Sequence, residues 1–430
     1  MERTIKFILR QWYTKQLFFK NVFWLYFAEV ASKGVRLFVF LFISRYLGPT
    51  EFGVFEYFFS FVGLFFLFSD LGISNIFIRD YNQNDDQKKL TLISEVFTLK
   101  LYLSIIFALL ALGGYLFTKN IGNIYIYIIF VLFYFFQNLE NYFESYFVAK
   151  QMSQKRFIFN FISSLVLLVF IIVGLIIWKN ILVVAMAYLL SMLTSLLIAY
   201  FLFWRETKII LNFSFPVTFL RLKYYIINGL PLALFGLLGF VFFATDRIFI
   251  THFLGPQMNG VYSVASRFVG VIQFIPSILT LAFFPILSFE VSRNNYKRLQ
   301  TILFVFTVLL ILIGLLSAVL MYLLSEELIL FIFGYEFALS VPILKVFVWI
   351  LIFLFPTNFL DYFLLSYNKQ WLDFILTLFP ALLNVILNII FIPLFGVLGA
   401  VYASIIAQCL NFILTFLASF FVLKRYSLAR

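Results

Sequence analysis

The sequence predicts an all-α integral membrane protein with twelve transmembrane helices built as two related halves. Its composition is the first reason: 64% of the 430 residues are hydrophobic and 12% are charged, against about 25% charged residues in a soluble domain. The second reason is that apolar runs of about 20 residues, long enough to span a bilayer, follow one another almost without interruption. The third reason is an internal repeat that contains the same helix-turn-helix twice.

The repeat relates a segment that starts at Arg45, RYLGPTEFGVFEYFFSF, to one that starts at Arg247, RIFITHFLGPQMNGVYSVASRF. The identical pairs, at a constant offset of 207, are Leu47 and Leu254, Gly48 and Gly255, Pro49 and Pro256, Gly53 and Gly260, Val54 and Val261, and Phe61 and Phe268. Each copy predicts a helix, a Leu-Gly-Pro turn and a second helix. We expect Gly255 and Gly260 to permit the tight turn and close packing, with Pro256 fixing the geometry of the turn.

Hydropathy places twelve spans along the chain. They lie at 22–47, 54–79, 90–117, 121–149, 156–178, 181–204, 224–252, 260–289, 299–324, 341–367, 370–392 and 396–423. No connection between them is large enough to form a soluble domain. The longest, residues 205–223, mixes basic and aromatic side chains, so we expect it to lie on the membrane surface.

The positions of Lys and Arg set the orientation of the spans. With the N-terminus inside, 22 of the 31 basic residues fall in cytoplasmic segments, and only Arg45, Lys119 and Lys179 fall in outer ones. An odd number of spans would break this alternation, so both termini are predicted to be cytoplasmic. The net charge of +12 is therefore a signature of membrane orientation and no indication of nucleic-acid binding.

Six basic residues are predicted to lie within the spans, with acidic companions in the same depth range; a charge there costs at least about 2.5–3.5 kcal/mol and normally faces protein or a water-filled cavity. The basic ones are Lys33, Arg36, Lys100, Arg247, Arg267 and Lys345, and the acidic ones are Glu29, Asp70, Glu95, Glu140, Asp246 and Asp361. Glu29, Lys33 and Arg36 share one helical face. Glu29 and Lys33 fit a self-neutralising pair and a functional site equally well, whereas the surplus charge of Arg36 favours a functional role.

The remaining intramembrane charges leave several alternatives open. Arg247 lies near the outer end of its span and fits snorkelling to the interface slightly better than a cavity role, and Lys345 fits snorkelling well. Lys100 lies too deep to snorkel, and Glu95, one turn away, is its expected structural partner. Asp70 fits a helix bend and an ion ligand equally well.

Catalytic constellations are absent from the sequence. It contains no Gly-rich phosphate loop, no nucleophile elbow and no paired cysteine motif. Cys409 and His252 are each the only residue of their type, so neither a disulfide within the chain nor a metal site is expected. These observations favour a transporter or a binding protein over an enzyme.

In their order and spacing, the motifs resemble those of Wzx-type polysaccharide transporters. The resemblance rests on RYLGPTEFGVFEYFFSF followed by SDLGISNIFIRD, on DRIFITHFLGPQMNGVYSVASRF followed by IPSILTLAFFPILS, and on the closing stretch from Asn384 through IPLFGVLGAVYASIIAQ. It covers residues 22–423. It implies membership of the superfamily that also contains multidrug and toxin extrusion transporters and the lipid II flippase.

The resemblance also implies an architecture and a function. The fold would be two six-helix pseudo-symmetric lobes around a central cavity, residues 1–204 and 224–430, joined by the cytoplasmic interfacial linker 205–223. The protein would flip a polyprenyl-diphosphate-linked oligosaccharide across the cytoplasmic (inner) membrane by alternating access, for capsule, exopolysaccharide or O-antigen synthesis. Membrane lipid and a polysaccharide polymerase are the expected partners. Because no nucleotide site exists, a proton or sodium gradient would supply the energy, without a cofactor.

A diphosphate is anionic, so its passage needs fixed positive charge. Arg36 and Arg267, in corresponding early helices of the two halves, resemble the cationic cavity residues of the lipid II flippase. The expected substrate-binding residues are Arg36, Arg267, Lys33, Lys100 and Arg247, and the expected ion-coupling residues are Glu29, Asp70 and Asp246. Two alternatives remain: an antiporter of drugs or organic cations, which would need an acidic cavity, and a membrane scaffold of the polysaccharide machinery without transport of its own.

Overall fold

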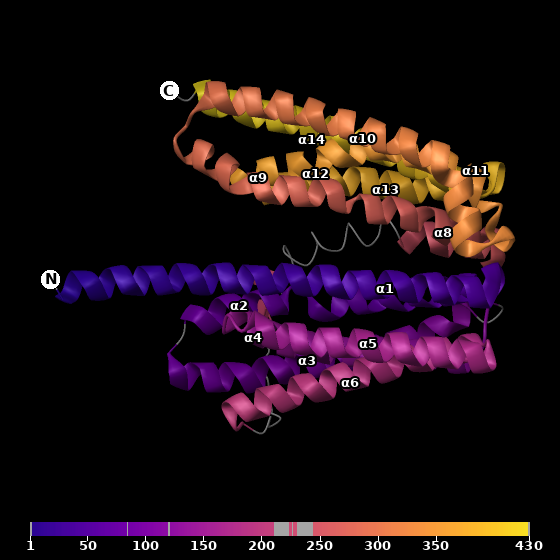
Figure 1. Cartoon of the computed structure of the whole chain (residues 1–430), viewed down its shortest axis with the longest axis horizontal. Helices are drawn as coiled ribbons and strands as arrows, with labels where there is room; N and C mark the ends of the chain where they lie inside the picture. Colours follow the sequence, from indigo (N-terminus) through magenta and orange to yellow (C-terminus); the bar gives the residue numbers. More distant parts are fainter. Residues whose placement is uncertain are drawn as a thin grey trace. The chain divides into compact units, whose positions relative to one another are not determined.

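The computed structural model describes residues 2–83, 85–118, 121–209, 223–225, 227–229 and 244–428, with side chains from residue 34 onward except at 86, 87, 427 and 428. Every regular element within these residues is helical, as Figure 1 shows, in agreement with the predicted all-α class. Much of the predicted linker 205–223 and of the seventh span, 224–252, lies outside the described residues.

The chain divides into two compact units. Unit 1 comprises Met1–Tyr46 and Val62–Ala233, and unit 2 comprises Leu47–Phe61 and Leu234–Arg430. The first copy of the repeated turn thus belongs by its contacts to unit 2, although the chain on either side of it belongs to unit 1.

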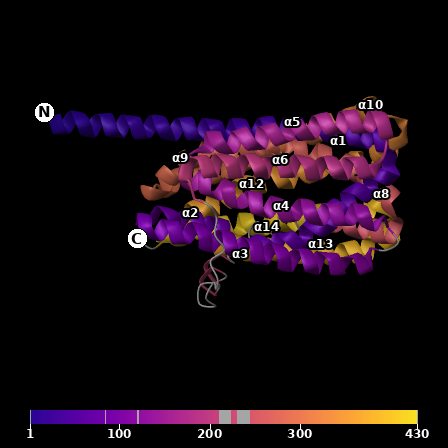
Figure 2. The ribbon, with the colours of Figure 1, turned by 90° about the horizontal axis from the view of Figure 1, so that it is seen from below.

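Unit 1 is built from the first six helices. They are α1 (Glu2–Asp70, of which 47–61 packs in unit 2), α2 (Ile73–Gln83), α3 (Asp86–Gly114, continued by η1, Tyr115–Phe117), α4 (Ile124–Ala149), α5 (Ser153–Trp178) and α6 (Ile181–Thr207). Figure 2 shows α5 and α6 running side by side. The side-chain oxygens of Asn123 and Asn180 accept the backbone N–H groups of Tyr125 and Leu182 and so cap α4 and α6.

The second predicted span is a broken helix. α1 ends at Asp70, Leu71 and Gly72 adopt positive φ angles of 45° and 74°, and α2 begins at Ile73. A side chain on Gly72 would overlap the backbone of Gly229, so only glycine fits at this close approach. Unit 1 is held together around this break by a buried core that joins α2, α3, α4 and α6.

Unit 2 contains the described helices that follow residue 243. They are a helical segment at 244–254, α8 (Pro256–Ile272), α9 (Phe274–Ser292), α10 (Tyr296–Phe333), η2 (Tyr335–Phe337), α11 (Ser340–Phe347), η3 (Val348–Ile350), α12 (Leu351–Ser366), α13 (Gln370–Phe395) and α14 (Val397–Leu428). Small residues permit close backbone approach here, as in membrane helices generally. Gly314 on α10 lies against the backbone at Leu351, and Gly399 on α14 lies against the backbone at Phe391.

Ten stretches of the described residues are long and apolar enough to cross a membrane. The first, Gly34–Gln83, contains most of the two opening predicted spans, and the others correspond to predicted spans 3 to 6 and 8 to 12. The largest departure is α10, which continues nine residues beyond the predicted end at 324. Glu326 and Glu327 end the apolar run but favour helix, so α10 continues until Gly334, whose φ of 90° stops it.

Candidate functional site

The two copies of the repeated turn have the same backbone conformation and pack against each other. Gly48 has φ 70° and ψ 175°, Gly255 has φ 88° and ψ 168°, and a proline follows each of them. A side chain on Gly53 would overlap the carbonyl oxygen of Pro256, and one on Gly260 would overlap that of Pro49. The positive φ of Gly255 agrees with its expected role in the turn, and the close approach at Gly260 agrees with the expected close packing.

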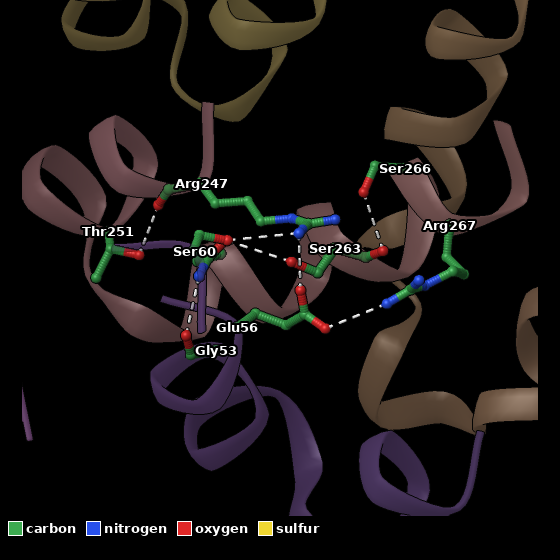
Figure 3. A network of polar contacts seen from close by, with 9 residues as sticks. Gly53, Glu56, Ser60, Arg247, Thr251, Ser263, Ser266 and Arg267 are labelled. Atoms are coloured by element: carbon green, nitrogen blue, oxygen red, sulfur yellow. Dashed lines mark hydrogen bonds and ion pairs between the residues drawn. The ribbon is translucent and has the colours of Figure 1, made fainter. Parts of the chain in front are cut away.

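A buried carboxylate lies one turn beyond this contact and binds two arginines. Glu56 on α1 is only 2% exposed. Its Oε2 atom lies 3.0 Å from Nη1 of Arg247, and its Oε1 atom lies 3.4 Å from Nη2 of Arg267. Figure 3 shows the two guanidinium groups reaching Glu56 from two sides, with Ser60 accepting a 3.5 Å hydrogen bond from Arg247. Arg247 is therefore not a simple snorkelling residue, because its guanidinium is held by a buried carboxylate.

The repeat explains how these groups meet. At the offset of 207, Glu56 corresponds to Ser263 and Ser60 corresponds to Arg267, and all four lie in the same network (Figure 3). One copy thus contributes the anion and the other the cation at positions that the symmetry places together. Two guanidinium groups thus share the carboxylate of Glu56. The side chain of Arg267 is 39% exposed, so it is the accessible member.

A second polar cluster surrounds Asp246, in the segment 244–254. Asp246 is 1% exposed, and its carboxylate accepts hydrogen bonds from the hydroxyl of Tyr262 at 2.5 Å, the amide of Asn388 at 2.6 Å and the hydroxyl of Ser404 at 2.7 Å. Asn384 donates to Ser404 at 3.2 Å and accepts from Asn388 at 3.1 Å. Four elements, 244–254, α8, α13 and α14, therefore converge on one carboxylate.

The donors around Asp246 are all neutral groups among the described residues. In addition, the side-chain oxygen Oδ1 of the fully buried Asn388 has no donor within the described part of the chain. A buried carboxylate without a countercharge is stabilised by a proton or a bound cation. This oxygen-rich cluster has the chemistry of a small-cation site with one carboxylate.

Unit 1 contains a buried ion pair at the helix break. Nζ of Lys100, which is 0% exposed, lies 2.7 Å from Oδ1 of Asp70 and donates to the hydroxyl of Ser74 at 2.7 Å. Ser74 in turn donates to Asp70 at 2.5 Å. Asp70 is the last residue of α1, so it both borders the bend and binds a cationic side chain. The sequence suggested Glu95 as the partner of Lys100; the structure shows Asp70 in that role, 30 residues away.

The other predicted site residues lie on the N-terminal part of α1. Arg36 is exposed, and it interacts electrostatically with Glu140 on α4, whose carboxylate is buried and accepts a 3.0 Å hydrogen bond from Ser195. The side chains of Glu29 and Lys33 lie outside the described residues. The structure thus brings Arg247 and Arg267 together at Glu56. Asp246, the neighbour of Arg247 in sequence, belongs to a different cluster. Lys100 pairs with Asp70.

A family model described as "Polysaccharide biosynthesis protein" matches residues 18–291, more than half of the chain. This chain belongs to the polysaccharide biosynthesis protein family. A second family model, MatE, matches residues 231–390. No curated protein matches the chain.

Solved structures share the fold of this chain at low sequence identity. An inward-facing multidrug resistance MATE family transporter of the MOP superfamily aligns with a TM-score of 0.74 at 17% identity, over 92% of this chain and 95% of its own. The lipid II flippase MurJ, in an inward closed conformation, aligns with a TM-score of 0.71 at 16% identity, over 92% of this chain and 87% of its own. A MOP superfamily transporter from Pyrococcus furiosus aligns with a TM-score of 0.63 at 19% identity, over 95% of this chain and 96% of its own. The chain therefore shares the helical fold of these membrane transporters.

Sequence reasoning missed Glu56, the residue that organises the arginine cluster of this polysaccharide biosynthesis protein. Hydropathy placed it within the second span, where the apolar neighbours of VFEYFFSF concealed it. The repeat carried the missing signal. Aligning the two copies puts Glu56 opposite Ser263, one helical turn before the pair Ser60 and Arg267, and so marks this face as polar in both copies.

Proposed function

We propose that this protein flips a polyprenyl-diphosphate-linked oligosaccharide from the cytoplasmic to the outer leaflet of the cell's cytoplasmic membrane, in the synthesis of capsule, exopolysaccharide or O-antigen. The two lobes, residues 1–204 and 224–430, are the moving bodies, and the linker 205–223 joins them on the cytoplasmic side. A polysaccharide polymerase would receive the flipped unit.

The observation that carries this proposal is the pair of arginines on one buried carboxylate. Two guanidinium groups meet at this one carboxylate, and the side chain of Arg267 is 39% exposed, so it can reach an anion. A diphosphate presents several charged oxygens, and the planar guanidinium group binds such oxygens in pairs. Arg267, the more exposed arginine, would meet the diphosphate first, and Arg36 is a further cationic residue proposed for the substrate. Lys33 and Lys100 are the further cationic residues proposed for the substrate.

Asp246 is the proposed coupling site. Its buried carboxylate has only neutral donors among the described residues, so a proton or a sodium ion binding there would change the charge of the cluster and with it the conformational preference. Asp70 and Glu29 are the further candidates for ion coupling in the first half of the chain.

Replacement of Arg267 by Ala, and separately of Arg247 by Ala, tests the substrate assignment. Each variant is expected to lose surface polysaccharide in cells and flipping of a fluorescent lipid-linked oligosaccharide in liposomes, at normal membrane abundance. Lys345→Ala is the matched control, because Lys345 is a partly exposed cation that lies 3.9 Å from Glu326. Full flipping by both arginine variants would refute the cationic site, and a wild-type protein that fails to flip the lipid while binding a polymerase would favour a scaffold.

Antiport of drugs or other organic cations is the second candidate. The MatE match over 231–390 and the uncompensated carboxylate of Asp246 favour it. Deletion of the chain separates the two functions. Loss of surface glycan with unchanged drug resistance supports the flippase, and the opposite pattern supports the antiporter.

A further inference from the structure

A cavity of about 160 Å³, lined by apolar and polar side chains, lies in unit 2 among α11, α12, α13 and α14 and the junction between α8 and α9. Its polar lining includes Gln273, Thr357, Asn358, Asp361, Ser404 and Gln408. A cavity of this size that offers a water molecule several polar partners holds water rather than remaining empty. The cavity adjoins the Asp246 cluster and contains no residue of the arginine cluster.

One end of the cavity reaches the Asp246 cluster. Ser404 lines the cavity and also donates to Oδ2 of Asp246 at 2.7 Å. A rotation of this one hydroxyl therefore exchanges its hydrogen bond to Asp246 for one to water in the cavity. Ser404 is the link between the buried carboxylate and the hydrated space.

The other end of the cavity reaches a second carboxylate, Asp361 on α12, which lies within hydrogen-bonding reach of Asp373 on α13. Asp373 is 2% exposed. The Oδ1 atoms of both residues are buried and have no donor among the described residues, and Oδ1 of Asn358, which also lines the cavity, has none either. Two carboxylates so close together repel each other strongly unless a cation or a shared proton lies between them. Buried oxygens without donors at this end are the ligands such a cation would use.

The two ends lie at different depths. Asp246 is eight residues before the end of its segment at residue 254, about 12 Å along the helix, whereas Asp361 is five residues before the end of α12 at Ser366, about 8 Å. The predicted topology puts the first helix end outside and the second, with the connection 367–369, in the cytoplasm. The cavity thus leads from a site in the outer half of the span toward the cytoplasmic side.

We propose that Asp361 and Asp373 form a second cation-holding station, and that the cavity is the hydrated path along which a proton or sodium ion moves between this station and Asp246. This inference rests on the proposed coupling role of Asp246. It gives the coupling cation a route within unit 2 that is separate from the arginine cluster and hence from the anionic substrate. No covalent step is involved, because the cation only exchanges oxygen ligands.

Charge movement tests this route without any glycan. Full-length protein in proteoliposomes on a solid-supported membrane is given a jump in proton or in sodium concentration, and the transient current is recorded. Asp361→Asn and Asp373→Asn are each expected to slow the current about 100-fold or more, the usual effect of removing a proton-transfer group, with binding at Asp246 retained. Asp246→Asn should abolish the current. The ion whose jump produces the current identifies the cation.

Two further variants make the outcome decisive. Asp361→Glu keeps a carboxylate and should retain the current, which separates a cation role from misfolding, and the exposed Glu326→Gln serves as the control (Glu326 is 64% exposed). A normal current in both asparagine variants would overturn the route, as would an equal loss in Asp361→Glu. A wild-type protein that moves charge but flips no lipid-linked oligosaccharide would refute the proposed function and leave this inference standing.

Discussion

Glu56 shows how one buried side chain fixes the state of two others. A buried carboxylate between two guanidinium groups offsets its desolvation cost only through those contacts, and removing one partner of such a cluster costs about 3–5 kcal/mol because the opposite charges remain buried and unpaired. Loss of Glu56 would affect Arg247 more than Arg267, because Arg267 is partly exposed and can be solvated by water. Glu56 is therefore a positioning residue for both arginines.

Replacement of Glu56 by Gln is expected to lower the thermal unfolding temperature of the detergent-purified protein, because Arg247 loses its counterion. Because Arg267 is partly exposed, the expected loss in the free energy of unfolding is about 3 kcal/mol, at the lower end of the range for buried pairs. Glu326→Gln is the matched control: it removes the acidic partner of an exposed pair, which contributes about 0–1 kcal/mol. Equal changes in the two variants would contradict the positioning role. Adding Arg247→Met to the Glu56 variant should restore part of the stability.

The sequence predicts that an intramembrane charge needs a polar partner, but it does not predict which residue that partner is. Lys100 and Asp246 were predicted to lie within the membrane, where each needs polar partners, and both lie in hydrogen-bonded clusters. Their partners come from helices far away in the chain, Asp70 for Lys100 and Asn388 for Asp246, because the rotation of each helix about its axis is set by packing. Spacing along one helix therefore favoured Glu95, which was the nearest carboxylate in sequence alone.

At the scale of elements, glycine positions determine how closely the repeated helices approach. The Leu-Gly-Pro turns were predictable because glycine and proline restrict the backbone locally, and Gly48 and Gly255 indeed share one conformation. Their mutual contact was not predictable, because two copies of a motif can lie at any separation. The break at Leu71–Gly72 has a similar explanation, since it depends on the close approach of Gly229.

Replacement of Gly260 by Ala is expected to force the two copies apart, because the new methyl group would overlap the carbonyl oxygen of Pro49. Overpacking of this kind costs about 1–3 kcal/mol. Gly270→Ala, on the same helix α8 but with nothing within 4 Å of the new carbon, should instead stabilise the helix by up to about 1 kcal/mol. The comparison is measured as thermal unfolding of the two purified variants. A Gly260 variant as stable as the Gly270 variant would show that the copies do not need this contact.

At the scale of the whole molecule, the family match and the shared fold agree with a two-lobed transporter, and the sequence reached that architecture through hydropathy, repeat and resemblance. Orientation in the membrane is a separate prediction. It rests on charge alone: the anionic inner surface and the membrane potential both favour Lys and Arg in cytoplasmic segments, which hold 22 of the 31 basic residues when the N-terminus is inside. An inverted chain would expose those 22 residues outside.

Labelling of single cysteines in intact cells tests this orientation. In a Cys409→Ser background, which removes the only native thiol, Lys179→Cys and Tyr335→Cys place exposed thiols in connections predicted to lie outside, and Ser292→Cys places one at an end predicted to lie in the cytoplasm. A membrane-impermeant maleimide should label the first two directly and the third only after permeabilisation. Because Lys179 and Tyr335 lie in different halves of the chain, labelling of only one of them would show an odd number of spans between them. The reverse labelling pattern would show that the orientation in the membrane is opposite to the predicted one, so that the proposed cation route leads toward the outer face.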